Sequence, residues 1–207
     1  MTPERLKILL APFLGEVQLS EAQLHQVSTH LALLLQWNAR INLTAIRDPE
    51  EIITRHFGES LLAARLLFTS DSRESAVDIG SGAGFPGLPL KVWSSNLELT
   101  LVESNQKKAV FLKEVVRRLD LTGMTVLTGR AEELNLQANV VCLRAVERFE
   151  AILPVARRLV ARGGRIALLI GDSQANRAKS ILADVRWQPA VPIPTSARRL
   201  FLLGTTS

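Results

Sequence analysis

The sequence predicts an α/β fold in which a mostly parallel sheet follows a group of helices and ends in an antiparallel hairpin. Three features lead to this prediction. The first 70 residues carry apolar positions at helical spacing, short apolar runs alternate with amphipathic segments after residue 70, and the last two apolar runs have no helix between them. We therefore expect residues 1–70 to form a helical segment that packs on a core made by residues 71–207.

Helix caps mark the first third of the chain. Ser20 and Gln23 have the spacing of a capping box, and a stripe of apolar residues at helical spacing follows them. Asp48 and Pro49 have the N-cap and first-turn preferences of a second helix. Residues 37–46, which lie between the two stripes, contain too many asparagines for a helix interior and are expected to form a loop.

Five short apolar runs after residue 70 are the predicted strands, at residues 75–80, 97–102, 124–128, 139–144 and 165–170. The amphipathic stretches between them, notably 105–119 and 150–162, predict helices. Strands that alternate with helices pair in parallel through right-handed crossovers. Residues 185–194 and 198–204 are expected to form an antiparallel pair.

The composition indicates one folded domain. The chain has 207 residues, of which 47% are hydrophobic, enough for one good core but not for two full-sized domains. It contains no apolar run of about 18 residues, and its N-terminus lacks the long apolar centre of a signal peptide. The single cysteine, Cys142, excludes an internal disulfide. We expect a cytoplasmic protein that has no membrane partner and acts as a monomer.

The positive charge is concentrated in the second part of the chain. The net charge is +5, yet residues 1–70 hold six Lys/Arg against seven Asp/Glu, so residues 71–207 carry the whole excess. A basic body of this kind attracts polyanions such as RNA, although a solvated arginine-rich surface fits the pattern equally well. The arginines concerned are Arg117, Arg118, Arg157, Arg158, Arg162, Arg165, Arg198 and Arg199.

A glycine-rich loop at residues 78–87 follows the first predicted strand. Gly80, Gly82 and Gly84 let the backbone turn sharply and approach a ligand closely. The spacing also fits the dinucleotide pattern G-x-G-x-x-G, and Glu103 lies 21 residues beyond Gly82, where a ribose-binding acid would lie. The motif by itself therefore leaves open whether the ligand is NAD or S-adenosylmethionine.

Two details of the loop favour S-adenosylmethionine. A dinucleotide needs N–H groups at the helix N-terminus for its pyrophosphate, and Pro86 and Pro89 remove two of these donors. S-adenosylmethionine has no phosphate, so their loss does not weaken its binding. Asp78 lies just before the glycines, where a carboxylate favours a ligand with an α-amino group and a sulfonium. We predict S-adenosylmethionine as the cofactor, with Asp78 among its contacts.

Acidic residues that follow later strands complete the predicted cofactor site. Glu103 ends the second strand and is predicted to accept both ribose hydroxyls, as acids do at this place in doubly wound sheets. After the third strand, backbone N–H groups and the Glu132 carboxylate would hold the adenine edge. A solvated loop or helix start fits this segment nearly as well, and both interpretations stay open.

Taken in order, several stretches of the chain resemble the RsmG (GidB) family of bacterial ribosomal RNA guanine-N7 methyltransferases. The asparagine–leucine–threonine segment, the Arg55–His56 pair and the glycine–proline loop occur together, whereas methyltransferases in general share only the loop. The matching stretches are residues 37–51, 55–60, 78–91, 101–114, 129–134 and 143–146. The resemblance implies a Rossmann-like class I methyltransferase sheet, with N-terminal helices packed near the active site.

The resemblance also implies which residues contact the cofactor and the substrate. S-adenosylmethionine is expected at Gly80, Phe85, Ala131, Glu132 and Arg144. The implied substrate is small-subunit (16S) ribosomal RNA or a ribosomal particle. On the substrate side we place Arg55, His56, Lys107 and Lys108, although the two lysines are equally well explained as ordinary surface charges. His56 and Arg144 are expected to position the reactants.

Three places depart from the family pattern. Residues 143–147 read LRAVE, where the family often has Ser-Arg-Ala-Phe/Val-Ala. Glu59 and Ser60 replace an Asp-Ser pair, and Ile170 with Gly171 replaces a common Lys-Gly. The differences leave the predicted cofactor site intact and concern the substrate side.

Devices that other base methyltransferases use are absent. Methylation of an exocyclic amine usually relies on an Asp/Asn-Pro-Pro-aromatic motif after the fourth strand, where residues 142–145 read CLRA. Carbon methylation of cytosine needs a cysteine nucleophile, and Cys142 lies in an apolar run and is expected in the core. Guanine N7 has an in-plane lone pair and no proton to lose, so its methylation depends on positioning. The absence of an obvious base is therefore consistent with N7 methylation.

No metal site is predicted, because His25, His30 and His56 share no ligand spacing with one another or with Cys142. His25 and His30 are expected to be helix-surface or partly buried side chains. The predicted function is S-adenosylmethionine-dependent methylation of N7 of a guanine in small-subunit ribosomal RNA. Two alternatives stay open, an NAD-dependent oxidoreductase and a non-catalytic RNA-binding protein of ribosome assembly.

Overall fold

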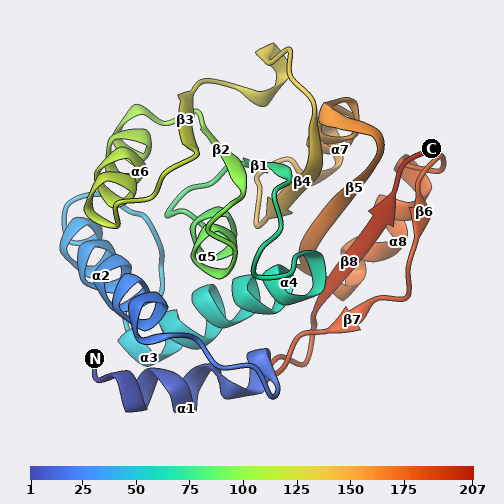
Figure 1. Cartoon of the computed structure of the whole chain (residues 1–207). Helices are drawn as coiled ribbons and strands as arrows, with labels where there is room; N and C mark the ends of the chain where they lie inside the picture. The colour runs from blue at the N-terminus through green and yellow to red at the C-terminus, as the bar shows by residue number, and fades with distance from the viewer.

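A mixed sheet in the strand order β3-β2-β1-β4-β5-β8-β6, with β7 also paired to β8, forms the centre of the molecule (Figure 1). The structure is a computed structural model that describes residues 1–207. The strands are β1 (Ser75–Ile79), β2 (Glu98–Glu103), β3 (Met124–Thr128), β4 (Ala138–Arg144), β5 (Val160–Gly171), β6 (Arg186–Trp187), β7 (Val191–Pro192) and β8 (Arg199–Thr205). All pairings among β1 to β5 are parallel, and those of β8 with β5, β6 and β7 are antiparallel. The predicted fold class is confirmed.

The helices begin where the caps predict. The Ser20 hydroxyl accepts from the Gln23 N–H and the Gln23 side chain accepts from the Ser20 N–H, and Asp48 caps the next helix through the Glu51 N–H. The α-helices are α1 (Pro3–Leu14), α2 (Glu21–Asn38), α3 (Pro49–Ile52), α4 (Glu59–Leu67), α5 (Gly87–Trp93), α6 (Gln106–Arg118), α7 (Phe149–Leu159) and α8 (Asp172–Ile181). A π-helix, η1 (Ile53–Gly58), joins α3 to α4, and a 3₁₀-helix, η2 (Ala131–Glu133), follows β3.

Helices cover both faces of the sheet (Figure 1). Side chains along a strand point alternately to the two faces, and β4 shows the result. Val140 and Cys142 belong to the hydrophobic cluster shared with α1 to α6, whereas Val141 and Leu143 belong to the cluster shared with α7 and α8. Cys142 is fully buried in the core, as predicted. No helix is long and apolar enough to cross a membrane.

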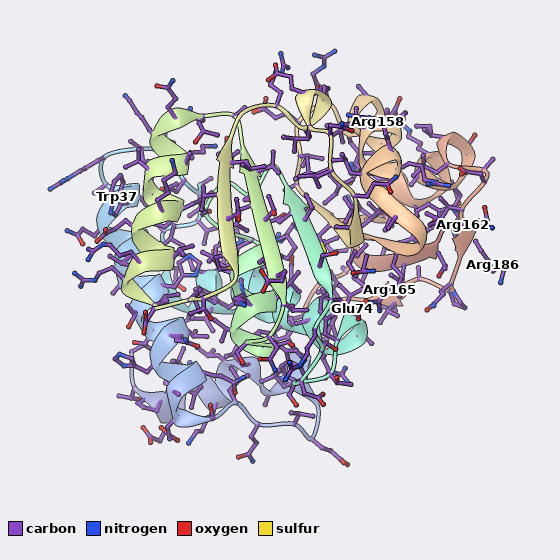
Figure 2. The ribbon with its side chains drawn as sticks, turned by 45° about the horizontal axis from the view of Figure 1, so that its top comes forward. Trp37, Glu74, Arg158, Arg162, Arg165 and Arg186 are labelled. Carbon is purple, nitrogen blue, oxygen red and sulfur yellow. The ribbon has the colours of Figure 1, made fainter.

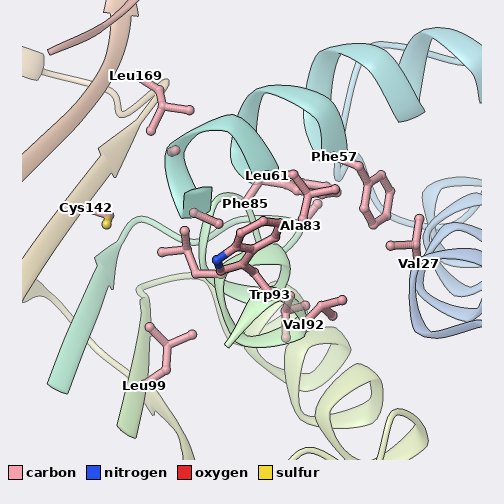
Figure 3. Packing of buried hydrophobic residues seen from close by; sticks show 14 of the residues in the cluster. Val27, Phe57, Leu61, Ala83, Phe85, Val92, Trp93, Leu99, Cys142 and Leu169 are labelled. Carbon is pink, nitrogen blue, oxygen red and sulfur yellow. The ribbon is translucent and has the colours of Figure 1, made fainter. Parts of the chain in front are cut away.

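The N-terminal helices share their core with the sheet. Figure 3 shows Phe57 of η1 near Val27 of α2, with Phe85 and Trp93 from the segment after β1 close by. The same cluster reaches Leu169 of β5. Burial of each large apolar side chain contributes roughly 1.5–3 kcal/mol, so this contact fixes the N-terminal helices against the sheet edge described below. The division of the chain at residue 70 stays a prediction.

Three elements differ from the sequence-based expectations. The helix predicted at 150–162 ends at Leu159, because β5 begins at Val160 and already pairs with Ala138. α8 was not predicted, since Ala178 is its only buried residue and its apolar stripe is weak. The predicted strand 185–194 consists of two short strands, and both pair with β8.

Candidate cofactor and substrate site

A cavity of about 590 Å³ lies at the carboxyl ends of β1, β2 and β4. The chain connects β1 to β2 on one side and places β4 on the other, so the cavity lies where the strand order reverses, the usual ligand position in doubly wound sheets. Nine predicted site residues line it: His56, Gly80, Gly82, Phe85, Glu103, Lys108, Ala131, Glu132 and Arg144. Four others, Arg55, Asp78, Gly84 and Lys107, are not part of its lining.

The glycines of the loop have different roles. Gly82 has a φ of +57°, and a Cβ added there would meet no atom of the protein closer than 3.8 Å, so it would project into open space. Because Gly82 lines the cavity, that space is available to a ligand. At Gly84, with a φ of +90°, a Cβ would lie 2.2 Å from the Leu88 side chain. Gly84 therefore serves the packing of α5, and its predicted contact with the cofactor stays a prediction.

Asp78 lies beneath the loop. It is fully buried, and its Oδ2 accepts a hydrogen bond of 3.0 Å from the Gly87 N–H at the start of α5. Its Oδ1 has no partner. Burial raises the pKa of the Asp78 carboxyl to about 7. The side chain holds the loop to α5, and its contact with the amino group of a ligand stays a prediction.

The N-terminus of α5 has no N–H group free for a pyrophosphate. The Gly87 N–H donates to Asp78 and the Leu88 N–H donates to the carbonyl of Gly84. Pro89 has no N–H at all. The structure therefore adds to the sequence-based argument against a dinucleotide, because the donors that would bind its phosphates are already used within the protein.

Glu103 both fixes the loop and lines the cavity. Its side chain is 6% exposed; Oε2 accepts from the Gly82 N–H at 2.9 Å and Oε1 accepts from the Asn105 N–H at 2.7 Å. A carboxylate can accept about four hydrogen bonds, so acceptor sites remain for the hydroxyls of a ribose. The geometry is compatible with the predicted ribose contact.

The wall predicted to hold adenine is the 3₁₀-helix η2. Ala131 is buried, and Glu132 is exposed where it lines the cavity. Arg158 of α7 donates to the carbonyls of Leu134 at 2.8 Å and of Glu132 at 3.0 Å. These bonds connect η2 to α7. They also give Arg158 partners within the protein, although the charge pattern had predicted it on a polyanion-binding surface.

Arg144 and His56 are in contact at the mouth of the cavity. The Arg144 Nη2 donates to Nδ1 of His56 at 2.9 Å, and Nε2 of His56 lies 2.8 Å from the Thr44 hydroxyl. An arginine cannot accept a hydrogen bond, so the imidazole carries its proton on Nε2 and donates to Thr44. Burial, together with the charge of Arg144, lowers the pKa of His56 to about 3. The ring is therefore neutral at physiological pH.

A single buried carboxylate joins three arginines behind this pair. Glu59 is 1% exposed and lies 3.0 Å from Nη2 of Arg144, 2.8 Å from Nη2 of Arg199 and 3.3 Å from Nε of Arg55. The cluster connects η1 and α4 with β4 and β8. Removing Glu59 would leave these positive charges uncompensated, which costs about 3–5 kcal/mol for a buried pair. The arrangement holds Arg144 in place and leaves a positive excess near the cavity.

Phe85 lies between two imidazoles. Its ring is stacked on His30 on one side and on His56 on the other, with centroids 5.0 Å apart in both cases. His30 is only 1% exposed and its Nε2 lies 2.9 Å from the carbonyl of Ala83. The expectation that His30 is a surface or partly buried side chain is therefore wrong. The sequence around His30 could not show this burial, because the polar partner of the imidazole is the carbonyl of Ala83, 53 residues away in the sequence.

Sequence reasoning missed other residues of the site. Thr44 lines the cavity, and the side chain of Asn38 holds its loop by accepting from the N–H groups of Leu43 and Thr44. Both lie in the asparagine-rich segment that carries the family resemblance, so this segment was a usable signal. Arg199 was treated only as surface charge, since nothing in the sequence relates it to Glu59.

Comparison with known proteins decides the family. The family model GidB, described as rRNA small subunit methyltransferase G, matches residues 23–191. The chain belongs to the GidB family. The family and the enzyme class predicted from the sequence are confirmed, and the oxidoreductase and the non-catalytic protein are not favoured.

Curated members of the GidB family are similar along most of the chain. "Ribosomal RNA small subunit methyltransferase G" of Roseiflexus castenholzii is 42% identical over 181 residues, which cover 83% of this chain and 76% of the relative. The protein of the same name from Chloroflexus aggregans is 44% identical, covering 79% and 70%. That of Xylella fastidiosa is 39% identical, covering 75% and 72%.

Solved structures share the fold of this GidB member. A SAM-dependent methyltransferase from Aquifex aeolicus superposes with a TM-score of 0.60 at 15% identity, covering 77% of this chain and 94% of that one. A ribosomal protein L11 methylase from Lactobacillus delbrueckii reaches a TM-score of 0.63 at 9% identity, covering 74% and 79%. At such identities the likeness concerns the fold alone.

Proposed function

We propose that this GidB member transfers the methyl group of S-adenosylmethionine to N7 of a guanine in small-subunit ribosomal RNA. The observation that carries the proposal is the cavity at the carboxyl edge of the sheet, in which the Gly82 loop and Glu103 face the Arg144–His56 pair. Family membership supports the reaction class and the cofactor. The proposed cofactor contacts are Gly80, Gly82, Phe85, Glu103, Ala131, Glu132 and Arg144.

Bound S-adenosylmethionine supplies an electrophilic methyl group, which leaves its sulfur as the N7 lone pair forms the new bond. The protein has to hold N7 in line with that methyl group. His56 is hydrogen-bonded at both ring nitrogens and its lowered pKa keeps it neutral, so it cannot remove a proton at neutral pH. This suits N7, which has no proton to lose. Arg144 and His56 act as positioning residues in this proposal.

Fewer basic side chains are free to bind RNA than the count of arginines in the sequence indicates. Arg117 pairs with Glu114, Arg157 pairs with Asp184, and Arg165 pairs with Glu74. Figure 2 shows Arg165 beside Glu74, with Arg162 and Arg186 on the same side of the molecule. Arg165 lies midway along β5 and is not part of the lining of the cavity.

Five cationic residues near the cavity form what we name the rim, and only Arg130 among them has a carboxylate partner, Glu132 at 4.0 Å: Lys107, Lys108, Arg130, Arg148 and Arg198. Each follows the carboxyl end of β2, β3 or β4 or precedes β8, so all lie at the edge where the cavity opens. Phosphate contacts fix the register of a nucleic acid without reading its sequence. We propose that the rim binds the RNA backbone around the target nucleotide. Arg55 pairs with Glu59, which also pairs with Arg144, and we propose that Arg55 contacts the substrate as well.

The test is mass mapping of methyl groups on small-subunit ribosomal RNA from cells with and without this protein. A single guanine that carries an N7 methyl group only when the protein is present is the expected result. Incubation of unmodified naked RNA and of unmodified small-subunit particles with the purified chain and S-adenosylmethionine then identifies the substrate form. Identical methyl maps, combined with no methyl transfer in vitro, would rule the proposal out.

A further inference from the structure

A second, smaller cavity lies next to the first. It has a volume of about 140 Å³ and shares Ala145 and Val146 of the segment after β4 with the larger cavity. A cavity of about 150 Å³ holds one benzene-sized ring. The cavity would therefore hold one six-membered ring of an occupant, and a second, fused ring would reach into the larger cavity.

The walls of the second cavity are mostly apolar, with two polar groups. Leu143, Phe149, Leu169 and Ile170 supply apolar surface, and Arg199 and Gln174 supply the polar side chains. An apolar lining with a few directional polar groups is typical of small-molecule sites. Phe149 supplies an aromatic ring to this lining, and nucleobases stack on aromatic side chains.

Both polar side chains have donors without acceptors. The Nη2 of Arg199 lies 2.8 Å from Glu59, but its buried Nε–H has no partner in the protein. The Gln174 Oε1 accepts from the Gly171 N–H at 3.0 Å, which fixes the orientation of the amide and leaves its NH₂ group without a protein acceptor. A matching ligand therefore presents acceptors, not donors, along this edge.

We propose that the second cavity holds the six-membered ring of the target guanine and that Arg199 reads its 6-oxygen; this inference rests on the proposed methylation of guanine. Guanine presents acceptors at O6 and N7, whereas adenine carries an amino donor at position 6. A donor that faces Arg199 would leave two N–H groups unpaired, which disfavours adenine. Pairing Arg199 with O6 alone leaves the N7 lone pair free for the methyl group in the neighbouring cavity. The base enters unstacked from its strand, as single-stranded RNA bases do.

The test uses the full chain saturated with S-adenosylhomocysteine and the free nucleosides guanosine, inosine, adenosine and 2-aminopurine riboside, observed by nitrogen-15 NMR. Inosine keeps the 6-oxygen of guanosine, and 2-aminopurine riboside lacks it. Guanosine and inosine are expected to shift the Gln174 amide and Arg199 Nε signals. Loss of the 6-oxygen should weaken binding on the order of tenfold to a hundredfold, the scale for a hydrogen bond from a charged donor.

Arg199→Lys keeps a positive charge beside Glu59 but cannot reproduce the Nε–H. It should bind guanosine no better than adenosine, whereas the control Arg177→Lys, on the exposed face of α8 where Arg177 pairs with Glu150, should keep the preference. If Arg199→Lys does not fold, the nucleoside series on the unmodified chain still decides. The inference is overturned if no nucleoside moves the two signals, or if adenosine moves them as strongly as guanosine.

Failure of the proposed function gives a different result. If ribosomal RNA receives no methyl group but guanosine still binds beside Arg199, the substrate assignment fails and the base pocket stands. If the RNA is methylated at N7 while guanosine does not shift the Gln174 and Arg199 signals, the proposed base pocket is wrong and the proposed methylation is right.

Discussion

The Nη2 atom of Arg144 lies 2.9 Å from Nδ1 of His56. This contact assigns the tautomer of the imidazole and joins β4 to the π-helix η1, because Arg144 ends the strand and His56 lies within the helix. The bond places a cation and a neutral ring side by side at the cavity, with Phe85 stacked on the ring.

Replacing Arg144 tests whether this pair positions the reactants. Arg144→Ala should lower kcat by on the order of a hundredfold, as expected when orientation is lost. The control is Arg165→Ala, which removes an arginine of β5 that pairs with Glu74 and does not line the cavity, and which should keep kcat. Single-turnover rates, with thermal unfolding of each variant, check the prediction. Equal losses in the two variants would mean that Arg144 matters only for stability.

The pH dependence of the rate follows from the state of His56. Its pKa of about 3 lies below its ordinary value, so the ring stays neutral at every pH above that value. No side chain has to remove a proton from N7, so the single-turnover rate should stay flat at mildly alkaline pH, above the pKa of about 7 of Asp78. A steep rise through one ionisation in the chemical step would show that a base is needed and that N7 is the wrong atom.

Gly82 gives a test of the cofactor cavity. Gly82→Val should abolish binding of S-adenosylhomocysteine, and Gly82→Ala should weaken it strongly, because the new side chain projects into the cavity. Gly163→Ala is the matched control, since Gly163 also has a positive φ, +70°, and open space at its Cβ. It carries the same backbone strain away from the cavity and should bind normally. Undiminished affinity of Gly82→Val in calorimetry would contradict the assignment.

Glu103 is predicted to be the ribose partner. Glu103→Ala should weaken cofactor binding by about 2 kcal/mol, the scale for losing charge-assisted hydrogen bonds to hydroxyls. Glu103→Gln keeps an acceptor for the Gly82 N–H and should lose less. Calorimetry on these variants and on Glu132→Ala measures the difference. If Glu103→Ala binds like the parent while Glu132→Ala does not, the ribose partner is wrong.

RNA binding should depend strongly on salt and on the rim. The slope of log K against log salt is about −0.9 for each duplex phosphate neutralised and about −0.7 for single strands. Lys107→Ala with Lys108→Ala should make the slope less negative by up to that amount per lysine. Arg117→Ala, on the same helix but paired with Glu114, should leave it unchanged. Filter-binding titrations at several salt concentrations measure the slopes, and a flat response of the parent chain would indicate recognition through ribosomal proteins.

The parallel strands β1 to β5, the helices other than α8 and the position of the glycine loop could be predicted from the sequence by itself. These features depend on local periodicity, caps and turn residues, which neighbouring positions encode. Glu103 was found for the same reason, because the end of a parallel strand has a fixed relation to the loop on the adjacent strand. The family resemblance added His56 and Arg144 without saying how they meet.

Only the tertiary structure decided what surrounds these residues. Arg144 and Glu59 are 85 residues apart in the sequence, and no local pattern relates them. The same holds for the ion pair of Arg199 with Glu59 and for the stacking of His30 with Phe85. Burial also changed the role of Asp78, whose carboxylate lies beneath the loop and holds α5. Such partnerships arise when the packing of whole helices and strands brings distant polar groups into a water-poor space, where each has to find a partner.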